Sequence, residues 1–171
     1  MAAGQLERLI EEWGPDGAPD SAAKALARAL HERIPLIAGA GVTAPIAYRW
    51  KTQINENAKI HAFAHELPEL DHNELVGWEG AAGQGAFAAV FLEDSDSHPR
   101  LARRVEMTCA AIEARGGETH RVETIGETSV ERVFSGVLLG DLVSLYMAVL
   151  RDVDPGPVEV LEQLKQDLAA R

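Results

Sequence analysis

A chain of 171 residues, 46% of them hydrophobic and 5% aromatic, is long enough for one domain with a buried core. Its formal net charge of −11 argues against nucleic acid as a partner, because phosphate binding needs clusters of Lys and Arg. Apolar runs such as Ala86–Leu92 are too short to span a bilayer, so no membrane partner is expected. The single cysteine, Cys109, is expected to be a buried helix residue and fits a reducing, cytoplasmic location.

Helix and strand patterns alternate along the chain. Apolar residues at helical spacing predict a helix at Gln5–Trp13, and a turn-rich break separates it from a second helix at Ala22–Arg33. Beyond it we expect strands at Ile34–Ala40, Ile60–Glu66, Ala86–Leu92 and Thr119–Thr124, and helices at Ala44–Lys59, Pro99–Arg115, Thr128–Arg151 and Pro157–Ala170. Gly116 and Gly117 should end the Pro99–Arg115 helix. This alternation predicts an α/β fold with a parallel sheet flanked by helices.

The polar stripe of the Ala44–Lys59 helix is the first candidate for a functional site. Arg49, Gln53 and Glu56 are four and three residues apart, so they lie one above another on the helix and face water or a ligand. His72 follows the next strand, in the cluster Asp71–Glu74. Since ligands of parallel sheets bind beyond the carboxyl ends of the strands, the start of this helix and the His72 cluster should share one rim. A carboxylate, an amide, a guanidinium and an imidazole suit proton transfer on a polar substrate.

Two other interpretations of nearby residues stay open. Gly39–Ala44 fits the dinucleotide pattern G-x-G-x-x-A, with Glu66 where a ribose-binding acid would lie, although a tight turn from strand to helix needs the same glycines. A metal set could comprise His61, His65, Glu69 and His72, but no fourth ligand has firm spacing, and His61 and His65 also fit as ordinary strand residues. We expect no metal. Trp50 and Ile54 should anchor their helix in the core.

Three segments carry a resemblance to a known family. RWKTQINENAK (Arg49–Lys59), PELDHNE (Pro68–Glu74) and the closing stretch Gly140–Lys165 resemble the C-terminal half of the bifunctional phosphoglucose/phosphomannose isomerases, enzymes with two lobes of the sugar isomerase (SIS) fold. The resemblance implies a flavodoxin-like SIS lobe over residues 34–171, preceded by linker-like helices at 1–33. It also implies a homodimer with active sites between subunits.

The resemblance assigns roles to individual residues. Glu56 would be the base that moves a proton between C1 and C2 of the open-chain sugar phosphate. His72 would assist ring opening in the site of the partner subunit, and Lys165 would match a lysine that contributes to the site. Arg49 and Gln53 are our own candidates for contacting the substrate. No metal or organic cofactor is required if hydrogen bonds stabilise the enediolate oxygens.

The chain also departs from that family. The usual enzyme has about twice this length, and the Gly-rich and Ser/Thr-rich loops that hold the phosphate in its N-terminal lobe are not present here. Either the chain is a catalytic lobe that works with a separate N-terminal lobe, or it is a non-catalytic sugar-phosphate-binding or dimerisation module. Anion capture at the helix start in Gly39–Ala44 is a possible substitute for those loops. The apolar helix Val130–Leu150 predicts a dimer or a larger assembly.

Overall fold

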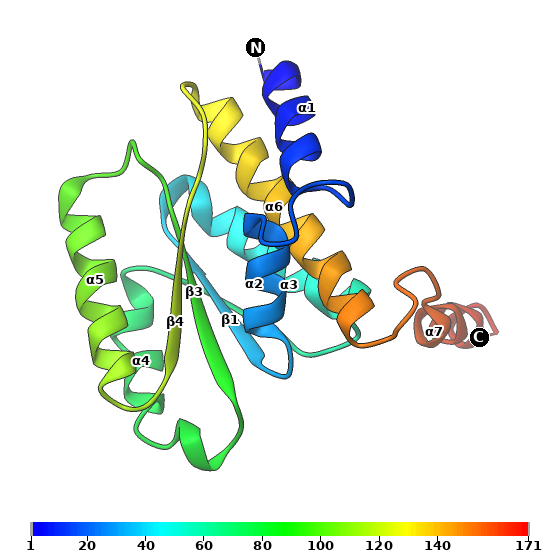
Figure 1. Ribbon diagram of the computed structural model, residues 1–171. Coiled ribbons are helices and arrows are strands. Elements are labelled where there is room, and N and C mark those ends of the chain that lie inside the picture. Colours follow the sequence, from blue (N-terminus) through cyan, green and yellow to red (C-terminus); the bar gives the residue numbers. More distant parts are fainter. Residues whose placement is uncertain (1, 171) are drawn as a thin grey trace.

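The sheet of this protein contains parallel strands in the order β2-β1-β3-β4 (Figure 1). The computed structural model describes residues 2–170. Met1 and Arg171, which are the outer ends of the expected regions 1–33 and 34–171, lie outside the described residues. All three pairings are parallel, which confirms the predicted α/β fold. The strands are β1 (Ile34–Gly39), β2 (Phe63–Glu66), β3 (Phe87–Glu93) and β4 (Glu118–Glu123).

Helices cover both faces of the sheet and create two cores. Because strand side chains alternate between faces, Ile37 and Val90 point to one core while Leu36 and Phe91 point to the other. The first core is covered by α1 (Ala2–Trp13), α2 (Ala22–Leu30), α3 (Ala44–Asn57) and α6 (Ser129–Leu150). On the second face lie α5 (Pro99–Glu113), the short α4 (Glu74–Gly77) and the 3₁₀ turns η2 (Glu69–Asp71) and η3 (Ala81–Gly83). Figure 1 shows α4 and α5 on the opposite side of the sheet from α1, α2 and α6.

Helix α6 forms the centre of the first core. Thr128 and Glu131 cap its start by reciprocal bonds between side chain and backbone. Trp50 of α3 is fully buried, and its Nε1 donates to the carbonyl oxygen of Gly136 at 2.8 Å. A Cβ added at Gly140 would overlap the same indole, so glycine lets the two helices approach this closely. By length and composition α6 could cross a membrane, which the sequence prediction overlooked, but nine of its residues are buried in this fold.

The apolar side chains of α6 that suggested an assembly surface divide into two groups. Most of them pack against the first core of the same chain: Val133, Val137, Leu138, Leu142 and Tyr146. Phe134 and Leu145 remain exposed. The apolar composition of α6 is therefore explained largely by packing within the chain, and assembly stays a prediction.

Two helices end earlier than the sequence indicated. The second helix ends at Leu30 rather than Arg33, because Glu32 has a φ of 63°, outside the helical range. Helix α3 ends at Asn57, and Lys59 has a φ of 55°. Both corrections place a residue other than glycine in the left-handed region, where sequence patterns rarely expect one.

The second strand is also shorter than expected. It begins at Phe63 rather than Ile60, because the N–H of Ala62 donates to the side-chain oxygen of Asn55 at 2.7 Å and not to a neighbouring strand. The predicted end of α5 is confirmed, since the helix is followed by Gly116 with a φ of 78°. The first helix begins at Ala2, three residues before the expected Gln5, and the other expected elements match to within two residues.

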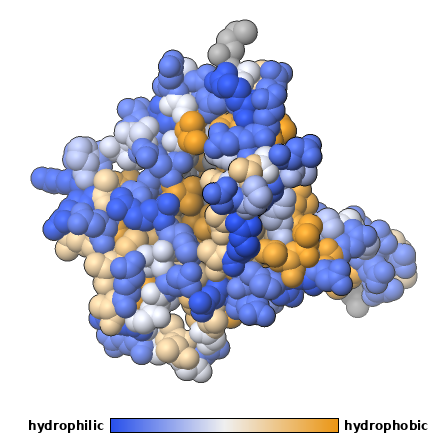
Figure 2. Space-filling view, viewed as in Figure 1, coloured by the Kyte–Doolittle hydropathy of each residue, from blue (hydrophilic) through white to orange (hydrophobic). Residues whose placement is uncertain are grey.

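The last helix, α7 (Glu159–Ala169), extends away from the body of the molecule (Figure 1). None of its residues is buried, although it carries an apolar stripe of Val160, Leu161, Leu164 and Leu168. Figure 2 shows it as an arm, with apolar atoms gathered where it joins the body. The amphipathic pattern of α7 therefore has no partner among residues 2–170.

Candidate functional site

Two members of the predicted polar stripe are occupied by contacts within the chain, Arg49 with α6 and Gln53 within α3. The guanidinium of Arg49 donates to both carboxylate oxygens of Asp141, at 3.0 and 2.8 Å. The hydrogen bond with Asp141 raises the pKa of Arg49. Gln53 accepts a hydrogen bond from Asn57 at 3.2 Å, and Asn57 also donates to Ser144 at 2.8 Å. Arg49 thus holds α3 against α6 directly, whereas Gln53 acts only through Asn57, and the sequence did not indicate either role.

Glu56 is the member of the stripe that lines a hollow. Its exposed side chain borders a groove of about 690 Å³ between the end of α3 and the segment that leads into α7. Thr52 and Asn55 lie on the α3 side of this groove, while Val160 and Leu161 lie on the α7 side. A carboxylate beside an apolar wall and hydroxyl and amide groups is suited to take a proton from a bound polar molecule.

Lys59 fixes the far wall of that groove. Its Nζ donates to the carbonyl oxygens of Pro155 and Pro157, at 3.3 and 2.7 Å. Nearby, Arg151 Nε donates to the carbonyl oxygen of Ala58 at 2.9 Å. Together these bonds attach the segment before α7 to the end of α3. Lys59 is the last residue of the NENAK motif, but its sequence context does not indicate this structural role.

His72 lies on the other face of the sheet from Glu56. The chain leaves β1 and β2 at the same edge, where Leu67 N–H donates to the carbonyl oxygen of Gly39 at 2.9 Å, so the expected common rim is present. From that rim α3 runs along the first core, whereas Leu70, just before His72, is buried in the second. His72 itself is exposed at the end of η2. One copy of the chain therefore presents Glu56 and His72 on different sides.

Lys165 lies on the protruding arm. It is exposed on α7, about one turn beyond Leu161 of the groove wall. Within residues 2–170 no hydrogen bond or ion pair joins Lys165, Glu56 and His72 to one another. The predicted site residues thus occupy three separate places in a single copy.

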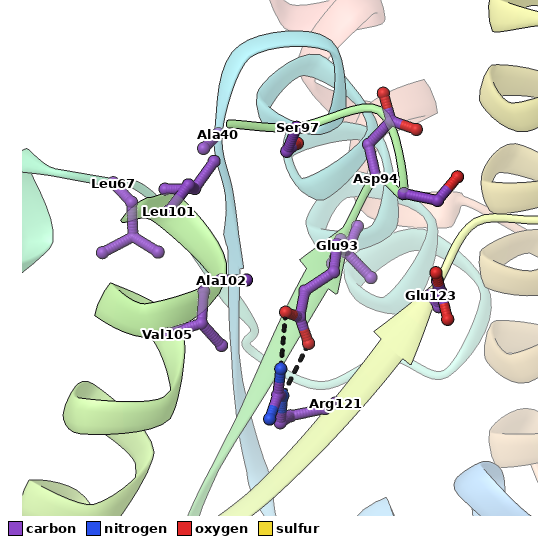
Figure 3. Close-up of a pocket in the computed structure, with 12 residues that line it drawn as sticks. Ala40, Leu67, Glu93, Asp94, Ser97, Leu101, Ala102, Val105, Arg121 and Glu123 are labelled. Carbon is purple, nitrogen blue, oxygen red and sulfur yellow. Dashed lines mark hydrogen bonds and ion pairs between the residues drawn. The ribbon is translucent and has the colours of Figure 1, made fainter. Parts of the chain in front are cut away.

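A second hollow, of about 280 Å³, lies at the carboxyl ends of β1, β3 and β4 (Figure 3), where parallel sheets usually bind ligands. Glu93 accepts two hydrogen bonds from Arg121 at 2.6 and 2.7 Å, which raise the pKa of Arg121. Asp94 also lines the hollow and lies 2.5 Å from the buried Arg132. With Glu123 on the wall, three carboxylates and one guanidinium line this hollow, a balance of charge that is unfavourable for a phosphate group. No local pattern in the sequence indicates this acidic crevice, because its lining comes from β3, β4 and α5 and from the residues just after β1 and β2.

The dinucleotide pattern forms a tight turn. A Cβ on Gly39 would overlap the carbonyl of Thr43, and Gly41 has a φ of 54°. The hydroxyl of Thr43 accepts from the N–H of Ala40 at 2.9 Å and lies 2.9 Å from the carbonyl oxygen of Leu92. The glycines therefore serve the turn from strand to helix, beside a crevice whose charge does not suit a pyrophosphate.

The histidines of the possible metal set are used differently from one another. His65 lies in β2 and its Nδ1 is 2.9 Å from Glu74, whereas His61 precedes the strand and stacks on Phe63, which corrects its expected strand position. In the part of the chain that the structure describes, no three His, Cys, Asp or Glu side chains are grouped to hold a metal ion. Cys109 is a buried residue of α5, as predicted, and this burial raises the pKa of its thiol.

Comparison with known proteins identifies relatives over most of the chain. A family model described as "Bacterial phospho-glucose isomerase C-terminal SIS domain" matches residues 19–168. The bifunctional phosphoglucose/phosphomannose isomerase of Caldicellulosiruptor bescii is 39% identical over 167 residues, which cover 96% of this chain and 49% of that protein. The protein of the same name from Aquifex aeolicus is 35% identical over 145 residues, or 85% of this chain and 45% of that protein.

A solved structure agrees with these relatives. The crystal structure of a glucose-6-phosphate isomerase like protein from Thermus thermophilus matches with a TM-score of 0.77 and 25% identity, over 96% of this chain and 54% of that one. The chain thus spans about half the length of the curated relatives it matches. It belongs to the family of C-terminal SIS domains of bacterial phosphoglucose isomerases.

Proposed function

We propose that this chain is the catalytic C-terminal lobe of a sugar-phosphate isomerase that interconverts glucose 6-phosphate or mannose 6-phosphate with fructose 6-phosphate in the cytoplasm. The observation that carries the proposal is the position of Glu56, whose exposed carboxylate borders a groove at the end of α3. Membership of the isomerase family supports it. Residues 34–171 would form the SIS unit, with 1–33 as linker-like helices that share its first core.

In the proposed reaction the carboxylate carries one proton between two carbons. Glu56 removes the proton from C2 of the open-chain aldose, and the electrons of that C–H bond form the enediolate. A second proton passes from the hydroxyl on C2 to the oxygen on C1, and the Glu56 carboxyl group returns its proton to C1, which gives the ketose and restores the carboxylate. His72 assists ring opening, Lys165 contributes charge to the site, and Arg49 and Gln53 shape its edge from the α3–α6 contact. This chemistry uses no metal or organic cofactor.

The complete site would need parts from outside one copy. Glu56 and His72 lie on different faces of the sheet, so His72 would serve the site of a partner subunit. The charge of the acidic crevice is unfavourable for phosphate, so the phosphate would be held by an N-terminal lobe that makes up the other half of the relatives' length. We therefore propose a homodimer that works with such a lobe.

A coupled assay tests this proposal. Fructose 6-phosphate is supplied to the purified chain, alone and with the N-terminal half of the C. bescii relative, and glucose 6-phosphate and mannose 6-phosphate are detected separately. Glu56→Gln keeps the shape of the side chain but cannot take the proton, so turnover should fall by about 10²-fold or more. Glu159→Gln, which changes another carboxylate of the same groove, should retain activity. Full activity of the Glu56→Gln variant contradicts the catalytic role.

The alternative is a non-catalytic sugar-phosphate-binding or dimerisation module. The acidic crevice favours it, because it leaves this lobe without an evident phosphate site of its own. Calorimetry with fructose 6-phosphate separates the two functions. Binding without turnover, even in the presence of the N-terminal half, would favour the module.

A further inference from the structure

We infer that Asp71 is a positioning residue that fixes the direction in which the side chain of His72 projects from the surface. This role rests on the function proposed for His72. The inference concerns a contact between two segments far apart in the sequence. Asp71 ends η2, while its partners Arg104 and Thr108 lie one turn apart on α5.

Both carboxylate oxygens of Asp71 are engaged by α5. Arg104 Nη1 lies 2.6 Å from Oδ2, and the hydroxyl of Thr108 donates to Oδ1 at 2.7 Å. Only 17% of the Asp71 side chain is exposed, and Thr108 is buried. Two bonds to different donors on one rigid helix fix the carboxylate in both position and rotation.

The neighbours of His72 are anchored on both sides. Leu70 is fully buried in the second core, and the backbone N–H of His72 donates to the carbonyl oxygen of Glu69 at 2.8 Å. Beyond it, Glu74 pairs with His65 of β2 at 2.9 Å. The imidazole of His72, by contrast, has no hydrogen bond or ion pair with any residue between 2 and 170. The backbone is thus held while the functional ring is left available.

This arrangement matters because proton transfer depends on distance. Misplacing a reacting group by about 1 Å can reduce the rate by about 10²-fold. An exposed histidine on a loose turn would sample many positions. The contact from Asp71 to α5 removes that freedom without using the imidazole itself, so it can determine whether the ring reaches a neighbouring active site.

The test measures the order of His72 in the intact chain by NMR relaxation, for the backbone amide and for the ring carbon between the nitrogens. Asp71→Asn removes the ion pair with Arg104, and Thr108→Val removes the other bond with a milder change of shape. In both variants we expect faster internal motion at His72, larger in Asp71→Asn. Arg103→Ala is the matched control, because Arg103 lies on the same helix and, in the described part of the chain, pairs only with the exposed Glu106.

Activity supplies a second measurement and separates this inference from the proposed function. In the assay above, Asp71→Asn should lower kcat about tenfold and change KM much less. The reason is that the position of His72 affects the chemical step and not the binding of substrate. If His72→Ala leaves turnover unchanged, the role proposed for His72 is wrong. If His72→Ala lowers turnover while both Asp71→Asn and Thr108→Val leave His72 as ordered as before, only the positioning role is overturned. The relaxation data decide this point even for a chain without turnover.

Discussion

By sequence α6 is apolar and α7 is amphipathic, yet the two helices have opposite environments in the fold. Helix α6 buries nine residues and receives the indole of Trp50 beside Gly136 and Gly140. Helix α7 buries none and leaves Leu161 and Leu164 exposed. Apolar spacing therefore shows that a helix has a face to bury, but not whether the same chain supplies the residues that cover it.

The two helices also differ in what they are expected to contribute, α6 to stability and α7 to assembly or activity. Contacts of α6 hold the first core together, whereas α7 carries Lys165 and forms a wall of the Glu56 groove. Substitutions in α6 should therefore change folding, and substitutions in α7 should change assembly or activity.

The largest effect is expected from Gly140→Ala. The added methyl group would overlap the indole of Trp50, which is fully buried and bonded to Gly136, so neither helix can move aside easily. We expect the free energy of unfolding to fall by about 3 kcal/mol. Urea denaturation followed by tryptophan fluorescence measures this change.

Gly4→Ala is the matched control for that substitution. It also lies within a helix, but a Cβ there meets no atom of residues 2–170 within 4 Å. Alanine should stabilise α1 by about 0.5–1 kcal/mol, because glycine is a poor helix residue. If both variants lost the same free energy of unfolding, the close approach of α3 and α6 would not limit the size of the side chain at position 140.

Much of the fold could be predicted from the sequence. The strand β3 was evident because its side chains are buried on both faces, which requires an unbroken apolar run. Trp50 and Ile54 were recognised as core residues because they recur at helical spacing on α3. Patterns of this kind are local, so a single segment contains all the information that they need.

Contacts between distant segments could not be predicted in the same way. Asp71 meets Arg104 and Thr108, 33 and 37 positions away, and nothing in either segment alone indicates the pairing. Arg49 was identified as a possible substrate contact, but Asp141 lies 92 positions further on and holds its guanidinium. The sequence therefore indicated which residue types are candidates for a site, whereas their actual partners required the fold.

A smaller effect on folding is expected from the double substitution Leu161→Gln and Leu164→Gln. Both side chains are exposed, so the free energy of unfolding should change by less than about 0.5 kcal/mol. The apolar stripe of α7 should instead promote association, and the double variant should have a lower mean mass by sedimentation at micromolar concentration. Gln163→Ala, on the same helix, is the control. A large loss of stability would show that α7 packs on its own chain.

The smallest effect concerns the starts of the two helices. Glu131 caps α6 together with Thr128, and the backbone hydrogen bond at Thr128 lowers its pKa, whereas Val158 before α7 makes no side-chain cap. Because the folded pKa is lowered, the stabilisation is present above the unfolded value of about 4.3 and is lost as the pH falls through the folded pKa. Melting temperatures of the wild type and Glu131→Gln should thus differ at pH 7 and converge towards pH 3. If the difference in melting temperature stays the same at every pH, the shape of Glu131 and not its charge stabilises α6. The start of α6 would then be no more sensitive to acid than the start of α7.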